Sequence, residues 1–128
     1  MTDHERTIAA LQEGGIIDIT TTGRTSGEPR RIEIVFFSVD GRVYITGLPG
    51  ARAWIANVKA DPRLTFHLKR GVTADLPARA RIVTDDAERR LVVETACQAW
   101  NRPGEVEAFV AGSPVIEVLF EEQDLRSA

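Results

Sequence analysis

The chain has 128 residues, a net charge of -3 and 43% hydrophobic residues, which fits one globular domain over residues 1–128. A net negative charge does not favour binding to nucleic acid. No apolar stretch approaches the ~20 residues that span a bilayer. The single cysteine, Cys97, and a polar N-terminus without a signal-peptide pattern indicate a cytoplasmic protein.

The first half of the chain predicts a helix followed by three consecutive strands. Thr2 and Glu5 have capping-box spacing and a Gly-Gly pair follows, so we expect a helix over residues 3–13. The β-branched and alternating apolar residues predict strands over residues 16–22, 31–39 and 42–47. Asp40 and Gly41 are typical of a two-residue hairpin turn between the last two strands.

The second half mixes helices with strands. Apolar spacing and alternation predict a helix over 52–60, strands over 63–69 and 74–83, a helix from Asp85 to about Trp100, a helix over 105–111 and a strand over 114–122. Pro77 places its strand at an edge or at a bulge, because proline cannot donate a ladder hydrogen bond. Hairpins outnumber strand–helix–strand crossovers, so we expect an α+β fold, a six-stranded and mostly antiparallel β-barrel with peripheral helices.

The segment TTTGRTSGEPRR, residues 20–31, is the first candidate site. Arg24 and Arg30 flank a Thr-Ser-Gly turn that contains Ser26 and Gly27. Guanidinium groups, hydroxyls and free backbone N–H groups together suit a phosphate or a carboxylate. Two interpretations stay open at this point, a solvated hairpin turn and an anion clamp.

The segment GLPGARAWIAN, residues 47–57, is the second candidate site, because a helix begins there and helix N-termini attract anions. Trp54 either packs in the core or forms the wall of a site for a planar ligand. Asn57, one turn later, either donates to a heterocycle or is an ordinary polar residue. No residue here is a convincing acid or base, so the catalytic residues stay unassigned and a cofactor is expected to carry the chemistry.

Metal-ligand spacing is absent, because His4, His67 and Cys97 are scattered along the chain. We expect His67 to lie on the polar face of its strand, at the surface or against the barrel; an axial haem ligand is the alternative. Cys97 is expected to be a small packed side chain.

In this order, the motifs TTTGRTSGEPR, DGRVYI, WIANVKADP and TDDAERR resemble those of the deazaflavin-dependent nitroreductase family. That family belongs to the flavin-binding split β-barrels, similar to pyridoxamine phosphate oxidase, and the resemblance covers Ile19 to Trp100. It implies a split barrel, often a homodimer, that transfers a hydride from reduced coenzyme F420 to a small-molecule acceptor, a quinone or a nitroaromatic compound.

The resemblance also implies which residues bind the cofactor. Arg30 takes the place of the arginine on the cofactor phosphate, and Arg24 lies near the phosphate and the tail. Trp54 and Asn57 lie by the ring and the tail entrance, and the end of the third strand runs beneath the ring. The predicted cofactor-binding set is Arg24, Ser26, Gly27, Arg30, Thr46, Gly47, Leu48, Trp54 and Asn57.

Two departures from the family pattern keep other functions open. Members that use the deazaflavin usually carry Ser-Lys-Gly-Gly after the third strand, whereas this chain has TGLPGAR, where only Arg52 could replace the lysine. Glu33 replaces a usual proline and Val35 an aromatic residue; a carboxylate near a phosphate must point away or pair with a cation. The alternatives are an FMN-binding reductase, a non-catalytic barrel that carries a cofactor or haem, and a dimeric scaffold.

Overall fold

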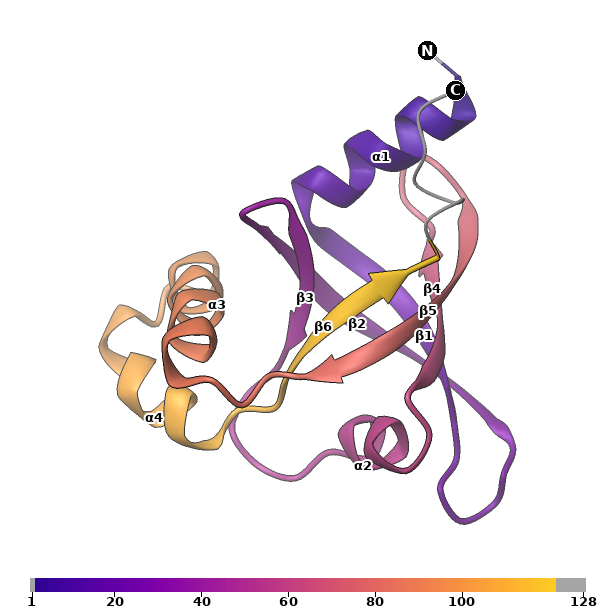
Figure 1. The fold of residues 1–128 in the computed structure, drawn as a ribbon. Coiled ribbons are helices and arrows are strands. Elements are labelled where there is room, and N and C mark those ends of the chain that lie inside the picture. Colours follow the sequence, from indigo (N-terminus) through magenta and orange to yellow (C-terminus); the bar gives the residue numbers. More distant parts are fainter. Residues whose placement is uncertain (1, 122–128) are drawn as a thin grey trace.

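Six antiparallel strands close into a barrel in the order β1-β2-β3-β6-β5-β4, which confirms the expected α+β barrel (Figure 1). The strands are β1 (Gly15–Thr22), β2 (Pro29–Val39), β3 (Arg42–Thr46), β4 (Arg63–Leu68), β5 (Ala74–Ile82) and β6 (Val115–Phe120). The computed structural model describes residues 2–121, so Met1 and Glu122, the last residue of the final predicted strand, lie outside it.

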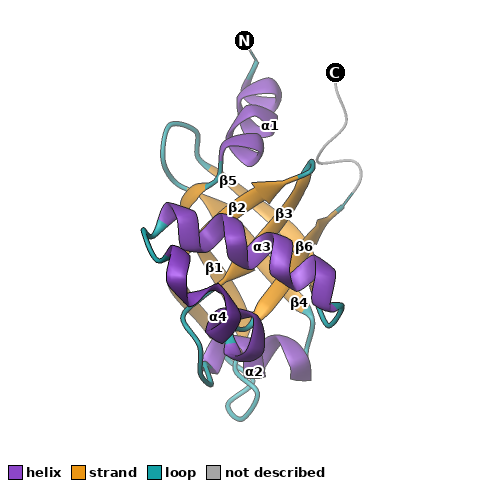
Figure 2. Cartoon of the chain, turned by 90° about the vertical axis from the view of Figure 1, so that its left-hand side faces the viewer, coloured by secondary structure: helices purple, strands orange, loops and turns teal. Residues whose placement is uncertain are grey.

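The helices cover one side and both ends of the barrel. They are α1 (Asp3–Glu13), α2 (Ala53–Ala60), α3 (Asp86–Ala99) and α4 (Val106–Gly112), with a short 3-10 turn at Pro103–Glu105. Figure 2 shows α3 and α4 lying across the outer face of the sheet, and Figure 1 shows α1 and α2 at opposite ends. None of the helices within residues 2–121 is long and apolar enough to cross a membrane.

Local capping signals explain where the two longest helices begin. The Thr2 hydroxyl accepts a hydrogen bond from the Glu5 N–H, and the Glu5 carboxylate reaches back to the Thr2 N–H, as the predicted capping box requires. Asp85 caps α3 by accepting from the Glu88 N–H at 2.9 Å. Each cap satisfies N–H groups that the helix itself leaves without a partner.

Two hydrophobic clusters share the barrel wall. Alternate side chains point into the barrel, where the most completely buried residues are Ile17, Ile19, Phe36, Ile45, Phe66 and Ile116. A second cluster lies between α3, α4 and the outer face of the wall, with Phe37 and Val39 of β2 opposite Val92 and Val93 of α3. Strand β2 is therefore buried on both faces near its C-terminal end, as its sequence predicts for a barrel wall. Cys97 is fully buried in the second cluster, as expected.

The start of β2 and the middle of β5 lie where the pairing of strands changes. β1 and β2 are paired to Thr22 and Pro29, so the β1–β2 hairpin extends beyond the barrel beside α2 (Figure 1). Ile32 lies outside the part of β2 that pairs with β3 and is 36% exposed, unlike the buried end of the same strand. Pro77 pairs with Thr65 of β4 and precedes Ala78, where the pairing of β5 with β6 begins. The barrel is closed and the pairing of β5 with β4 is continuous through Pro77, so the predicted edge or bulge is wrong; the proline instead directly precedes the ladder with β6.

Candidate functional site

The β1–β2 turn spans only six residues, Gly23 to Glu28, because β1 ends at Thr22 as predicted and β2 begins at Pro29, two residues earlier than its sequence predicts. The Gly23 N–H donates to the Glu28 carbonyl and the Gly27 N–H donates to the Gly23 carbonyl, each at 2.8 Å. Gly27 has a φ of 71°, a left-handed value that favours glycine. A Cβ at Gly23 would lie 2.5 Å from the Ser26 Oγ. The two glycines therefore let the turn fold tightly around the Ser26 hydroxyl.

Ser26 links the turn to the arginine that follows it. Its Oγ accepts hydrogen bonds from the Glu28 N–H at 3.2 Å and from Arg30 Nη2 at 3.3 Å. Arg24 and Arg30 take part in none of the ion pairs of residues 2–121. Both guanidinium groups therefore keep donors and an uncompensated charge for an anion.

A cavity of about 470 Å³ separates this turn from α2. Five residues of the predicted cofactor-binding set line it together: Arg24, Ser26, Arg30, Trp54 and Asn57. Sequence reasoning missed Thr21 and Ile32, which also line it; the alternation of β1 and β2 was the available signal. The turn and α2, far apart in the sequence, thus form one site.

Asn57 holds the turn against α2. It is 7% exposed; its Oδ1 accepts from the Arg24 backbone N–H at 3.1 Å, and its Nδ2 donates to the Thr21 hydroxyl at 3.1 Å. These bonds occupy much of the capacity of the amide, so its main task in this structure is to position the turn. The sequence suggested donation to a heterocycle, because the partner across the barrel end could not be seen from local spacing.

Trp54 packs in the core, as one of the two interpretations expected, and also lines the cavity. It is 7% exposed and belongs to the core of the barrel, yet it also forms part of the cavity wall. An indole held by core packing offers a rigid apolar surface to a planar ligand. Ile32 adds a further apolar side chain to this cavity.

The remaining predicted residues do not line this cavity. Thr46 is 1% exposed, and its hydroxyl donates to the Pro114 carbonyl at 2.7 Å, so it ties β3 to the segment before β6. Gly47 and Leu48 belong to the loop after β3, where Leu48 is 44% exposed. Gly27 lines a different cavity, of about 640 Å³, beside β4 and β5. The structure therefore brings together the turn and α2, but not the end of β3.

A second cavity, of about 700 Å³, adjoins the first, because Arg24 lines both. It lies between α2 and the end of α4, and its other cations are Arg52, Lys59 and Arg89. Arg52 donates to the Leu48 carbonyl at 3.3 Å and does not line the first cavity, where the sequence suggested that it replaces a lysine. Arg89 belongs to the TDDAERR motif, which could have indicated a role for it.

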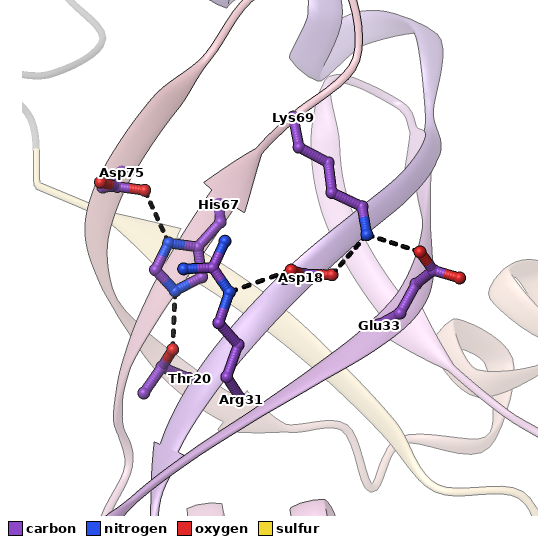
Figure 3. A network of polar contacts seen from close by, with 7 residues as sticks. All are labelled: Asp18, Thr20, Arg31, Glu33, His67, Lys69 and Asp75. Atoms are coloured by element: carbon purple, nitrogen blue, oxygen red, sulfur yellow. Dashed lines mark hydrogen bonds and ion pairs between the residues drawn. The ribbon is translucent and has the colours of Figure 1, made fainter.

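The outer face of β1, β2 and β4 carries a network of polar contacts (Figure 3). Asp18 pairs with Arg31 at 2.9 Å and with Lys69 at 2.7 Å, and Lys69 also pairs with Glu33. Lys69 and Arg31 hold the pKa of Asp18 below its ordinary value, and Asp18 and Glu33 raise the pKa of Lys69. Glu33, which replaces the usual proline of the family, is thus paired with a lysine. This pairing is one of the two arrangements expected for a carboxylate near a phosphate.

His67 lies beside this network, in a separate group with Thr20 and Asp75 (Figure 3). It is 7% exposed; its Nε2 lies 2.7 Å from the Thr20 hydroxyl and its Nδ1 lies 2.7 Å from Asp75 Oδ1. Both ring nitrogens therefore have hydrogen-bond partners, which leaves none for axial haem ligation. Its hydrogen bond also lowers the pKa of Asp75.

Comparison with known proteins decides the family. Residues 2–107 match the family model described as F420H(2)-dependent quinone reductase. The chain belongs to this family. The match confirms the family expected from the sequence, with coenzyme F420 as its cofactor and a quinone as its acceptor.

Solved structures agree with this family and with the barrel. An F420-H2 dependent reductase, FDR-A, is 25% identical, with a TM-score of 0.64 over 81% of this chain and 93% of that one. A chain solved as a domain-swapped dimer is 25% identical, with a TM-score of 0.63 over 89% and 94%. A candidate pyridoxamine 5'-phosphate oxidase from Listeria innocua is 13% identical, with a TM-score of 0.73 over 93% and 94%, and supports the fold alone.

Proposed function

We propose that this F420H(2)-dependent quinone reductase family member binds reduced F420 in the cavity between the β1–β2 turn and α2. The observation that carries this proposal is the convergence of Arg24, Ser26 and Arg30 on one cavity, with neither arginine paired to a carboxylate. A phosphate accepts charge-assisted hydrogen bonds, and an unpaired guanidinium need not break an ion pair to donate them.

The rest of the cavity suits the other parts of such a cofactor. Trp54 and Ile32 supply apolar surface for a planar ring, and the start of α2 supplies backbone N–H groups without a side-chain cap. When bound, the reduced cofactor supplies the hydride, and the chain has to hold it beside a quinone and exclude water.

Proton delivery has no dedicated residue in this cavity. Its lining contains hydroxyl, amide and guanidinium groups, but no carboxylate, histidine or lysine. We propose that the reduced quinone takes its proton from solvent or from a hydroxyl, and that the chain contributes binding and orientation rather than acid–base catalysis.

Two neighbouring arginines on opposite faces of β2 test the proposal. F420 titrated into the purified protein should bind at micromolar concentration, and Arg30→Ala should weaken binding by roughly 10-fold or more, since a charge-assisted hydrogen bond contributes about 1.5–3 kcal/mol. Arg31→Ala removes the same charge from the face where Arg31 pairs with Asp18, and should leave the dissociation constant unchanged. Equal effects of both substitutions, or tight FMN binding without F420 binding, would refute the phosphate clamp.

We also propose that nitroaromatic compounds are secondary acceptors and that the chain works as a cytoplasmic homodimer. The domain-swapped dimer among the similar structures supports self-association, and the single buried thiol of Cys97 is compatible with a reducing compartment. Light scattering on the purified protein measures the assembly, and a monomer at assay concentration would remove the dimer from the proposal.

A further inference from the structure

The second cavity is lined by cations of which only Arg24 also lines the first cavity. Of the described residues, its lining contains four cations, Arg24, Arg52, Lys59 and Arg89, and no aspartate or glutamate. None of the four takes part in an ion pair of residues 2–121. Elsewhere Arg31, Arg63, Arg81 and Arg90 all lie against carboxylates. Four cations outside the ion pairs of the described residues therefore meet at this one cavity.

Arg89 contributes the most enclosed of these charges. Its guanidinium is half-buried and donates to the carbonyls of Val83 at 3.2 Å, Val110 at 2.7 Å and Ser113 at 2.7 Å. Carbonyl oxygens satisfy its hydrogen bonds without neutralising its charge. A positive charge held at a fixed place beside apolar side chains favours an anion in the adjacent space.

Ser113 adds an independent sign of an absent partner. The residue is 3% exposed and lines the same cavity, and its hydroxyl has no hydrogen-bond partner among residues 2–121. A buried hydroxyl without a partner costs free energy that a ligand oxygen could recover. Apolar side chains of Ile55, Ile82 and Val115 line the cavity as well. The set suits a ring that carries an anionic group.

We propose that this cavity is the acceptor subsite and that it selects quinones bearing an anionic substituent, a carboxylate or a sulfonate. The inference rests on the proposed F420 site, because Arg24 stands on the wall that both cavities share. A cofactor phosphate held by Arg30 and Ser26 in the first cavity leaves Arg52, Lys59 and Arg89 for the second ligand. The acceptor's ring would lie on the apolar wall and its anion beside Lys59.

Steady-state kinetics with reduced F420 and a matched pair of acceptors test this assignment. The pair is 1,2-naphthoquinone-4-sulfonate and uncharged 1,2-naphthoquinone. Lys59→Ala and Arg52→Ala should each raise KM for the sulfonate roughly 3- to 10-fold, as expected for the loss of one charged hydrogen bond, and leave KM for the uncharged quinone unchanged. Ser113→Ala should raise only the first KM, by a smaller factor.

Arg70→Ala is the matched control, since Arg70 is an exposed cation of the β4–β5 turn that lines neither cavity. It should change neither KM. Equal effects of Lys59→Ala on both quinones would overturn the anion selectivity. A weaker affinity for F420 in Lys59→Ala, with both acceptor constants unchanged, would assign the cavity to the cofactor's tail and also overturn it.

A redox-inert ligand separates this inference from the proposed cofactor site. Titration of the protein with 1-naphthoate, followed by calorimetry, should show binding that Lys59→Ala weakens and Arg30→Ala does not. One outcome is that F420 does not bind, while naphthoate binds and its binding is weakened by Lys59→Ala but not by Arg30→Ala. That result would support the anion subsite and refute the proposed cofactor site. If naphthoate does not bind while F420 does, the subsite is refuted and the cofactor site stands.

Discussion

Charges on the outer face of β1, β2 and β4 are paired, whereas Arg24, Arg30, Arg52, Lys59 and Arg89, which line the two cavities beside α2, take part in none of the ion pairs of residues 2–121. Asp18, Arg31, Glu33 and Lys69 satisfy one another across three strands (Figure 3). Arg30 is the immediate neighbour of Arg31 but lies on the opposite face of β2, and among the described residues its one side-chain partner is the Ser26 hydroxyl. The difference shows that strand alternation alone can separate a structural ion pair from a cation available for a ligand.

The two regions also differ in what holds their backbone. The paired face lies on continuous ladders, where Asp18 is opposite Glu33 of β2 and His67 of β4. The β1–β2 turn extends beyond the barrel and depends on the side chain of Asn57. Substitutions at the turn should therefore change ligand binding and local order, whereas substitutions in the network should change mainly stability.

The largest effect is expected at Asn57. Asn57→Ala removes two hydrogen bonds, leaves the buried Thr21 hydroxyl and the Arg24 N–H without their partner, and should lower the free energy of unfolding by about 2–3 kcal/mol. Urea unfolding measures this loss. Asn57→Asp keeps the acceptor for the Arg24 N–H, so it should cost less stability but still weaken anion binding through its charge. If Asn57→Ala is as stable as wild type, the turn does not depend on this side chain.

Gly23→Ala should disturb the clamp with a smaller effect on stability. The new Cβ would lie 2.5 Å from the Ser26 Oγ, so the serine must move and its contact with Arg30 should be lost. We expect F420 to bind roughly 3- to 10-fold more weakly, the equivalent of one hydrogen bond. The substitution should add nothing to Ser26→Ala in a double-mutant cycle. If the losses of F420 affinity in the two single variants add up in the double variant, Gly23→Ala does not act through Ser26.

The paired face predicts a pH dependence of stability. The pKa of Asp18 and of Asp75 is lowered in the folded protein, and Arg63 lowers that of Asp61 to about 2. A lowered folded-state pKa stabilises the protein above the unfolded pKa, near 4, and this stability is lost as pH falls towards 2. Urea unfolding at pH 2–5 should show this decline. Asp18→Asn should make the free energy of unfolding fall less steeply with decreasing pH. The change in slope should correspond to less than one proton bound on unfolding.

Glu94→Gln is the control for that slope. Glu94 is an exposed residue of α3 that forms no ion pair with the residues of the described chain. The substitution should leave the decline in stability between pH 5 and 2 as steep as in wild type. An Asp18→Asn variant with the wild-type slope would mean that the network contributes nothing to acid stability.

The smallest effect is expected at Ser113, next to the second cavity. Ser113→Ala removes a hydroxyl without a partner and should change the free energy of unfolding by less than about 0.5 kcal/mol. Thr46→Val is the matched comparison, because it removes a buried hydroxyl that donates to the Pro114 carbonyl, and should cost about 1 kcal/mol. Equal losses in the two variants would show that the Ser113 hydroxyl is satisfied in solution.

Much of the fold could be predicted because its signals are local. The Thr2–Glu5 capping box forms as expected, and Asp40 and Gly41 take the positive φ values of a tight hairpin. Alternation along β4 assigns Phe66 to the core, but it does not show that His67 on the opposite face is also buried. That burial depends on side chains from β1 and β5, and so on the pairing of strands.

The candidate site was predictable only in part for the same reason. The spacing of Arg24, Ser26 and Arg30 within one turn indicates a clamp, because a turn of a few residues brings its side chains together. The role of Asn57 depends on a contact with Thr21, 36 residues earlier in the chain. Thr46 was expected beside the cofactor ring, but its hydroxyl binds a carbonyl 68 residues away.

By itself, the sequence determined the order of helices and strands, the antiparallel barrel, and a cationic turn with the motifs of an F420-binding family. These follow from periodicity, capping and turn chemistry, which act over a few residues. Only the tertiary structure decided which cations stay unpaired. Closure of the barrel places Lys69 against Asp18 and Glu33, and it places Arg89 with Lys59 at a cavity without carboxylates. Pairing depends on distances across strands and helices, and local spacing does not encode those distances.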